Sequence, residues 1–226
     1  MSNTLVLNNI IRVQQWYRKI LYKPIFSCKS IIEILNLNEN IMKKCLYECI
    51  SISKNFPPRK NEYKFIYGKL VEISLLNAFR DIGLNCIDLD KNHKVGSEYK
   101  NDISIFKNKF SIKAKLNRGG DVILLNKKST AKHNVNLNLM LLVINEGKLY
   151  IFPSNFDSSI NINEYIKEDA GCISYKSKLF SLIDKKYTEY IYTFPQLDEE
   201  QKISLSDLEE QDIMNDLYNN IIKLKI

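Results

Sequence analysis

The chain has 226 residues, and 45% of them are hydrophobic, which is enough for one sizeable globular core. No apolar run approaches ~18 residues, and the first residues lack a charged stretch followed by an apolar one, so we expect no transmembrane span, no signal peptide and a cytoplasmic protein. The five cysteines form no CxxC pair, which argues against a disulfide scaffold and a zinc site.

The net charge of +7 is unevenly spread along the chain. Residues 198–226 hold eight acids and three lysines, a balance of −5, so the residues before them carry +12. Residues 91–132 hold eleven Lys or Arg and three acids, a local balance of +8. Such a concentration favours binding to a phosphate backbone. The chain is also rich in Lys, Asn and Ile and poor in Arg, so an AT-rich genome is an alternative source of the lysines.

Residues 1–56 predict an N-terminal helical region. Apolar residues recur there at helical spacing, and Pro24 and the segment 36–40 separate three helical segments. The adjacent prolines Pro57 and Pro58 forbid helix continuation and mark a linker. The region after this linker, residues 61–155, is expected to form an α/β core.

The core begins with a predicted amphipathic helix over residues 62–82, which Gly83 ends. Glu72 falls at helical spacing with Leu75, Leu76 and Phe79, on the face that should be buried. A carboxylate on that face costs several kcal/mol unless it is paired or binds a metal ion. The alternative is a half-buried glutamate whose carboxylate reaches water.

Two strand-like runs follow, residues 101–106 and 110–115, and a turn is predicted at Lys107–Lys109 between them. Alternation places Asp102 and Ser104 on one face of the first run. The second run presents three polar residues on one face: Ser111, Lys113 and Lys115. A hairpin brings the Asp carboxylate and the Lys ammonium to the same side, where they form a solvated ion pair or a site for a divalent cation and a phosphate.

Further along the chain, residues 126–134 predict a second core helix, and residues 139–144 predict a buried strand with a hairpin partner at 148–153. Residues 156–226 form a predicted C-terminal extension, with a strand at 190–194 and a last helix from Ser206 to Lys225. The chain has no P-loop and no GxGxxG motif, so no nucleotide cofactor is expected.

The order of a helix Glu72, a strand, Asp102 and then Lys113 on the next strand resembles the PD-(D/E)XK nuclease superfamily, which includes restriction endonucleases and junction resolvases. The resemblance covers residues 62–153. It implies an α/β fold with a mixed central sheet and flanking helices, a restriction-endonuclease-like core. It also implies Mg²⁺, with Mn²⁺ as the alternative, held by Asp102 and Glu72. Lys113 would position the attacking hydroxide and offset phosphate charge.

Two residues depart from the superfamily pattern. Asn101 replaces the proline before the motif aspartate, and Ser111 replaces the acidic residue two positions before the lysine. Serine offers only a neutral oxygen, so cation affinity should fall unless another carboxylate substitutes. Glu72 and Glu98 are the candidates for that substitution. If neither serves, the domain binds DNA without cutting it.

The expected function is Mg²⁺-dependent hydrolysis of DNA phosphodiester bonds by a type II restriction-type endonuclease. Its partners would be double-stranded DNA and a second copy of the chain, because a palindromic site requires a two-fold dimer. The expected DNA contacts are Lys115, Arg118, Lys127, Lys128, Lys132 and His133. The alternatives are a structure-specific nuclease similar to a junction resolvase, a catalytically decayed DNA-binding protein and a protein scaffold.

Overall fold

The computed structural model describes residues 28–58, 63–89, 102–126, 138–152, 160–169 and 172–206. Its centre is a mixed six-stranded sheet, in spatial order β1 (Cys86–Asp88), β2 (Ile103–Ile105), β3 (Asn108–Lys115), β5 (Leu139–Val143), β6 (Lys148–Phe152) and β9 (Ile191–Thr193). A smaller antiparallel sheet contains β4 (Val122–Asn126), β8 (Cys172–Tyr175) and β7 (Ile166–Asp169). The helices are α2 (Cys28–Asn36), α3 (Glu39–Asn55), α4 (Lys64–Asp81), α5 (Ser177–Lys186) and α6 (Glu199–Ser206), with 3-10 turns η2 (Ile144–Glu146), η3 (Ile162–Tyr165) and η4 (Thr188–Tyr190).

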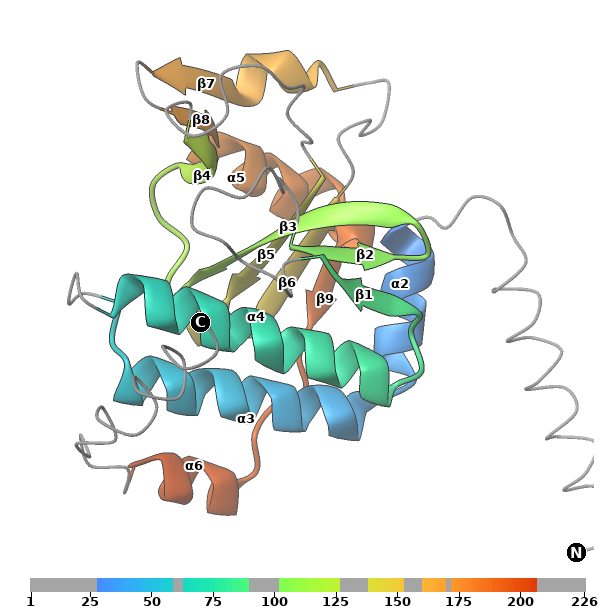
Figure 1. The fold of residues 1–226 in the computed structure, drawn as a ribbon, viewed down its shortest axis with the longest axis vertical. Helices are drawn as coiled ribbons and strands as arrows, with labels where there is room; N and C mark the ends of the chain where they lie inside the picture. The colour runs from blue at the N-terminus through green and yellow to red at the C-terminus, as the bar shows by residue number, and fades with distance from the viewer. Residues whose placement is uncertain are drawn as a thin grey trace, which may run out of the picture.

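The central sheet is covered on both faces. Helices α3 and α4 lie on one face, and α5 and the smaller sheet lie on the other (Figure 1). Each face has its own hydrophobic cluster, and successive residues of β5 alternate between the two clusters, so all five are buried. The prediction of an α/β fold with a mixed sheet flanked by helices is therefore confirmed.

Helix α4 is the element that the sequence predicted most closely. It runs from Lys64 to Asp81, within the expected range, and Gly83 follows with a φ of +79°. The Leu84 N–H donates to the Phe79 carbonyl at 2.9 Å, which closes the helix end around that left-handed glycine. The chain then turns from the C-terminal end of α4 into β1.

The β2–β3 hairpin has the predicted faces but a different turn. Phe106 and Lys107 carry positive φ values of 47° and 71°, and Ile105 pairs with Asn108. The expected turn at Lys107–Lys109 was wrong, because this two-residue left-handed turn matches the twist of the paired strands better than a three-residue one. The apolar residues of both strands face α4, as alternation predicted, and these are Ile103, Ile105, Phe110 and Ile112.

Strand β5 lies parallel to β3 and antiparallel to β6, so the predicted buried strand and its hairpin partner are confirmed. The predicted second core helix, residues 126–134, does not begin at Asn126. Asn126 ends strand β4, which pairs with β8 across about fifty residues of sequence, and the local pattern carries no signal for such a distant partner. Residues 127–134 lie outside the described residues.

The two flanking regions also contribute to the core. Helices α2 and α3 confirm the helical prediction for residues 28–55, and residues 1–27 lie outside the description. Strand β9 joins β6, and buried Tyr192 and Phe194 pack in the same cluster as α3 and α4. Helix α6, which ends at Ser206, was not predicted, and the predicted last helix from Ser206 to Lys225 lies outside the described residues apart from Ser206. No helix among the described residues has the length and apolar character to cross a membrane.

Candidate functional site

The Asp102 carboxylate lies where strands β2 and β3 separate. Its Oδ2 accepts a hydrogen bond from the Ile112 backbone N–H at 2.6 Å and one from the Ser111 hydroxyl at 3.1 Å. The Ile112 N–H points toward β2 in the plane of the sheet, since the neighbouring Ser111 N–H bonds to Asn138 on the other side. The carboxylate therefore accepts the hydrogen bond that a backbone carbonyl of the β2 strand would otherwise accept. It lies in the gap between the two strands.

Glu72 approaches this carboxylate from helix α4. Its side chain is only 13% exposed, and its Oε1 accepts from the Lys69 ammonium at 2.9 Å. The pKa of Glu72 is raised to about 7, first by burial and then by the negative charge of Asp102, while Lys69 opposes both effects. Two carboxylates from distant parts of the chain thus lie close enough to repel one another.

Asp88 is a third acid at this position that the sequence reasoning missed. It lies on β1 in register with Ile103, on the face of the sheet that α4 covers, and its charge also raises the pKa of Glu72. The only sequence signal was alternation in the run from Cys86 to Asp88. That signal pointed the wrong way, because the apolar Ile87 is the exposed member.

Lys113 does not join the two carboxylates through any described contact. It pairs in register with Leu141, whose side chain belongs to the cluster on the α5 face, so Lys113 projects on the face opposite α4. It is half-buried and makes no hydrogen bond or ion pair with a described residue. Lys113 and Ser111 share a face, as predicted, and Ser111 reaches Asp102 from that face.

Two of the expected DNA contacts have partners inside the protein. The Lys115 ammonium donates to the carbonyls of Gly119, Gly120 and Asp121 at 2.5, 3.2 and 3.1 Å, and burial lowers its pKa. The prediction that Lys115 contacts DNA stays untested, but such a contact would cost these three hydrogen bonds.

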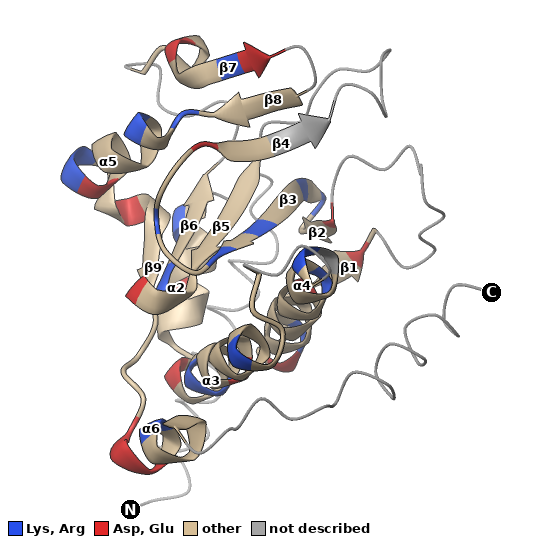
Figure 2. Cartoon of the chain, turned by 90° about the vertical axis from the view of Figure 1, so that its left-hand side faces the viewer, with Lys and Arg blue, Asp and Glu red and all other residues tan. Residues whose placement is uncertain are grey.

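Arg118 forms an ion pair with Asp184 and donates from Nη1 to the Tyr150 hydroxyl at 3.1 Å. The network anchors the loop after β3 to β6 and α5. In Figure 2 the lysine positions of β3 are coloured blue, and β3 lies beside α4. Five further predicted residues lie outside the described part of the chain: Glu98, Lys127, Lys128, Lys132 and His133.

The donor set at Asp102 and Glu72 fits a magnesium ion better than a metal that needs a protein cage. Within the described ranges no three Asp, Glu, His or Cys side chains gather tightly enough to hold a metal ion. Mg²⁺ is commonly held by one or two carboxylates, with waters and substrate phosphates completing its coordination. Asp102, where β2 and β3 separate, and Glu72 on α4 supply two such carboxylates.

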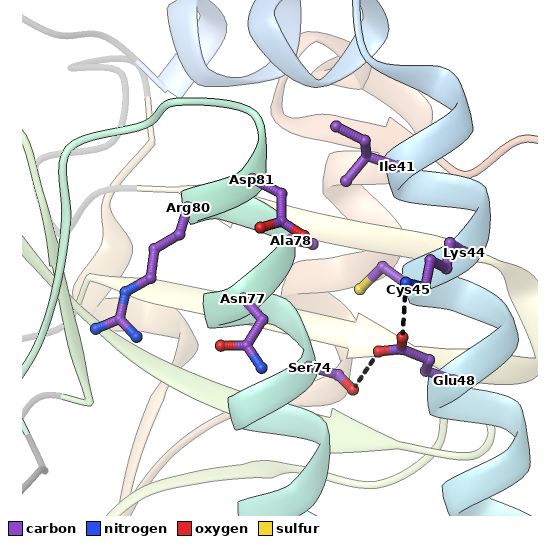
Figure 3. A pocket seen from close by; sticks show the side chains of 9 residues that line it. All are labelled: Ile41, Lys44, Cys45, Glu48, Ser74, Asn77, Ala78, Arg80 and Asp81. Carbon is purple, nitrogen blue, oxygen red and sulfur yellow. Dashed lines mark hydrogen bonds and ion pairs between the residues drawn. The ribbon is translucent and has the colours of Figure 1, made fainter.

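A hollow with a volume of about 320 Å³ lies between α3 and α4, away from Asp102 and Glu72 (Figure 3). Its charged groups are balanced, two basic and two acidic: Lys44, Arg80, Glu48 and Asp81. The Ser74 hydroxyl donates to Glu48 at 3.0 Å, and Lys44 lies 4.0 Å from the same carboxylate. The Glu48 carboxylate is thus already paired, and the residues that line the hollow present no set of hydrogen-bond donors directed at one ligand.

Comparisons with known proteins give no independent assignment for this site. No family model, no curated protein and no solved structure matches the chain. The functional interpretation therefore depends on the geometry around Asp102 and Glu72.

Proposed function

We propose that the protein is a metal-dependent nuclease that hydrolyses phosphodiester bonds of DNA. The observation that carries this proposal is the pair formed by Asp102, in the gap between β2 and β3, and buried Glu72, whose pKa the Asp102 charge raises. A divalent cation between two such carboxylates would replace their repulsion with attraction to both.

Each side chain has a distinct role in the proposed reaction. Asp102 and Glu72 would hold Mg²⁺ or Mn²⁺, which supplies charge stabilisation to the phosphate in the transition state. Lys69 keeps Glu72 oriented through its 2.9 Å ion pair. Lys113, half-buried on the same face as Ser111, would orient the attacking water and offset charge on the scissile phosphate.

The order of the elements supports the same proposal. Helix α4 is followed by β1, β2 and β3 in an antiparallel arrangement, and β5 then lies parallel beside β3. A helix followed by three strands and a later strand in one mixed sheet is compatible with the core that the resemblance implies, although β4 precedes β5 in the chain. We further propose double-stranded DNA as the substrate and a homodimer as the acting form, because restriction-type recognition of a palindrome requires two-fold symmetry.

A cleavage assay on mixed-sequence supercoiled plasmid with Mg²⁺ tests the proposal. The wild type should cut, Asp102→Asn should lose activity by at least 10²-fold, and Lys113→Ala should lose much of it while still binding the cation. Asp81→Asn, an exposed acid on the same helix as Glu72, and Lys109→Ala, on the same strand as Lys113, are matched controls that should cut normally. Wild-type rates in both site variants would refute the assignment.

The products separate the narrower alternatives. Discrete fragments indicate a restriction-type enzyme, and cleavage of branched DNA alone indicates a structure-specific nuclease similar to a junction resolvase. DNA binding with strong salt dependence and no cleavage indicates a decayed site. The observation that favours decay is Ser111, a neutral residue where the resembled superfamily has a carboxylate.

A further inference from the structure

Ser111 is a buried residue whose hydroxyl donates to Asp102. The residue is 3% exposed and lies on β3 between buried neighbours. Its Oγ donates to Asp102 Oδ2 at 3.1 Å, whereas the Ser53 hydroxyl, in a helix, donates to a backbone carbonyl at 2.7 Å. A buried serine hydroxyl can bond to the local backbone, as that of Ser53 does. The hydroxyls of Ser111 and of Ser74 donate to a carboxylate instead.

Both donors that reach Asp102 converge on one oxygen. The Ile112 N–H and the Ser111 hydroxyl both bond to Oδ2, and no described residue donates to Oδ1. Two hydrogen bonds from the same strand restrict rotation of the carboxylate about its terminal torsion. The result is a carboxylate with Oδ2 held by strand β3, while Oδ1 accepts no hydrogen bond from a described residue.

We propose that Ser111 is a positioning residue, which orients the Asp102 carboxylate so that Oδ1 is presented to a divalent cation shared with Glu72. This inference rests on the proposed function. Ser111 then compensates for the acid that the resembled pattern places here: it supplies no ligand of its own but lowers the cost of orienting one. Hydrogen bonds to ligating carboxylates commonly change metal affinity by 10–100-fold.

Calorimetric titration of the full chain with Mn²⁺, without DNA, tests this role through three substitutions. Ser111→Ala removes the hydroxyl, Ser111→Cys keeps the size with a weak donor, and Ser111→Thr keeps the hydroxyl. Ser104→Ala is the matched control, because Ser104 is also a buried serine, 6% exposed, on the neighbouring strand, and it makes no hydrogen bond to Asp102. Urea unfolding of each variant confirms that the chain is folded under the titration conditions.

The expected result is about a 10-fold or greater loss of Mn²⁺ affinity in Ser111→Ala and Ser111→Cys. Ser111→Thr should bind within about 3-fold of the wild type, and Ser104→Ala should match the wild type. Equal affinity in wild type, Ser111→Ala and Ser111→Cys would overturn the positioning role and leave the nuclease proposal standing. A wild type that binds no Mn²⁺ would overturn both.

Discussion

At the scale of single residues, the buried polar groups differ in how completely they are paired. Asp102 Oδ2 accepts two hydrogen bonds, and the Tyr150 hydroxyl accepts from Arg118 and donates to Asp184. Glu72 has one cationic partner but two acidic neighbours, so its ionised form is disfavoured at neutral pH. An incompletely compensated carboxylate reduces the stability of the folded chain at neutral pH, and a cation bound at the proposed site would offset this cost.

This difference predicts a pH-dependent stability for Glu72. Its folded pKa of about 7 lies above the ordinary value of 4.5, so the folded chain binds this proton more tightly than the unfolded chain. The contribution of Glu72 to stability is therefore highest below 4.5 and is lost as pH rises through 7. Glu72→Gln carries no titrating carboxyl group and lacks this loss of stability. As pH rises from 4.5 through 7, the free energy of unfolding of the variant should therefore increase relative to that of the wild type.

Urea unfolding in EDTA across this pH interval measures the effect. Glu33→Gln, an exposed glutamate on α2, controls for removal of one negative charge. A constant difference between Glu72→Gln and wild type over the whole interval would show that Glu72 is not held in the protonated form.

Tyr150 gives a second prediction at this scale. Its side chain is fully buried, and its hydroxyl bonds to Asp184 at 2.8 Å and to Arg118 at 3.1 Å. Tyr150→Phe leaves both charged partners with one hydrogen bond fewer and should lower the free energy of unfolding by about 1–2 kcal/mol. Tyr192→Phe is the matched control, because the Tyr192 hydroxyl is buried and has no hydrogen-bond partner in the described structure. It should be neutral or slightly stabilising, and a similar loss in both variants would contradict the role of the network.

At the scale of elements, the β2–β3 hairpin brings Asp102 opposite Ser111 and Ile112. Its register depends on the turn at Phe106 and Lys107, and a slip of one residue would move Ser111 to the α4 face and away from Asp102. Phe106 packs partly against the core, which helps to hold the turn despite its unfavourable backbone angles. The site thus depends on a turn whose two central residues are not glycine.

Lys107→Gly should strengthen this hairpin. Lys107 is exposed and has a φ of 71°, a conformation that costs a non-glycine residue about 1–2 kcal/mol. The substitution should raise the free energy of unfolding by about 0.5–1 kcal/mol after the entropy of glycine in the unfolded chain is subtracted. Lys109→Gly, at an exposed extended position of β3, should lower it by a similar amount, and the same sign for both variants would disprove the assigned turn.

At the scale of the whole molecule, two hydrophobic clusters share one central sheet. The cluster on the α5 face contains residues of β5 and β6 together with Tyr175, Leu179 and Phe180, which follow the predicted boundary at residue 155. The other cluster includes Tyr192 and Phe194 from the same C-terminal region. The C-terminal residues therefore cover both faces of the sheet that carries Asp102.

A chain ending at residue 155 is expected not to fold. It would expose five side chains that are fully buried in the complete structure: Leu139, Leu141, Val143, Tyr150 and Phe152. At about 1.5–3 kcal/mol for each, the loss is comparable with the whole stability of an ordinary domain. A chain ending at Ser206 is the control and should unfold cooperatively. Dispersed amide resonances from the shorter chain would show that residues 156–206 are dispensable.

Local periodicity by itself determined several elements of this protein. The helical spacing before Gly83 predicted α4, alternation predicted the two faces of the β2–β3 hairpin, and a continuous apolar run predicted β5. These features follow from backbone geometry within one element, so they can be read from neighbouring residues. The placement of Ser111 opposite Asp102 is not of this class, because it depends on the hairpin register, and the turn expected at Lys107–Lys109 would have set a different one.

Only the tertiary structure decided which distant side chains meet. Glu72 and Asp102 are thirty positions apart, and Asp88 comes near Glu72 because β1 pairs with β2 on the face that α4 covers. The pairing of β4 with β8 and the ion pair between Arg118 and Asp184 also join residues that are distant in the sequence. Register between elements depends on the packing of the whole core, and a local pattern does not contain it.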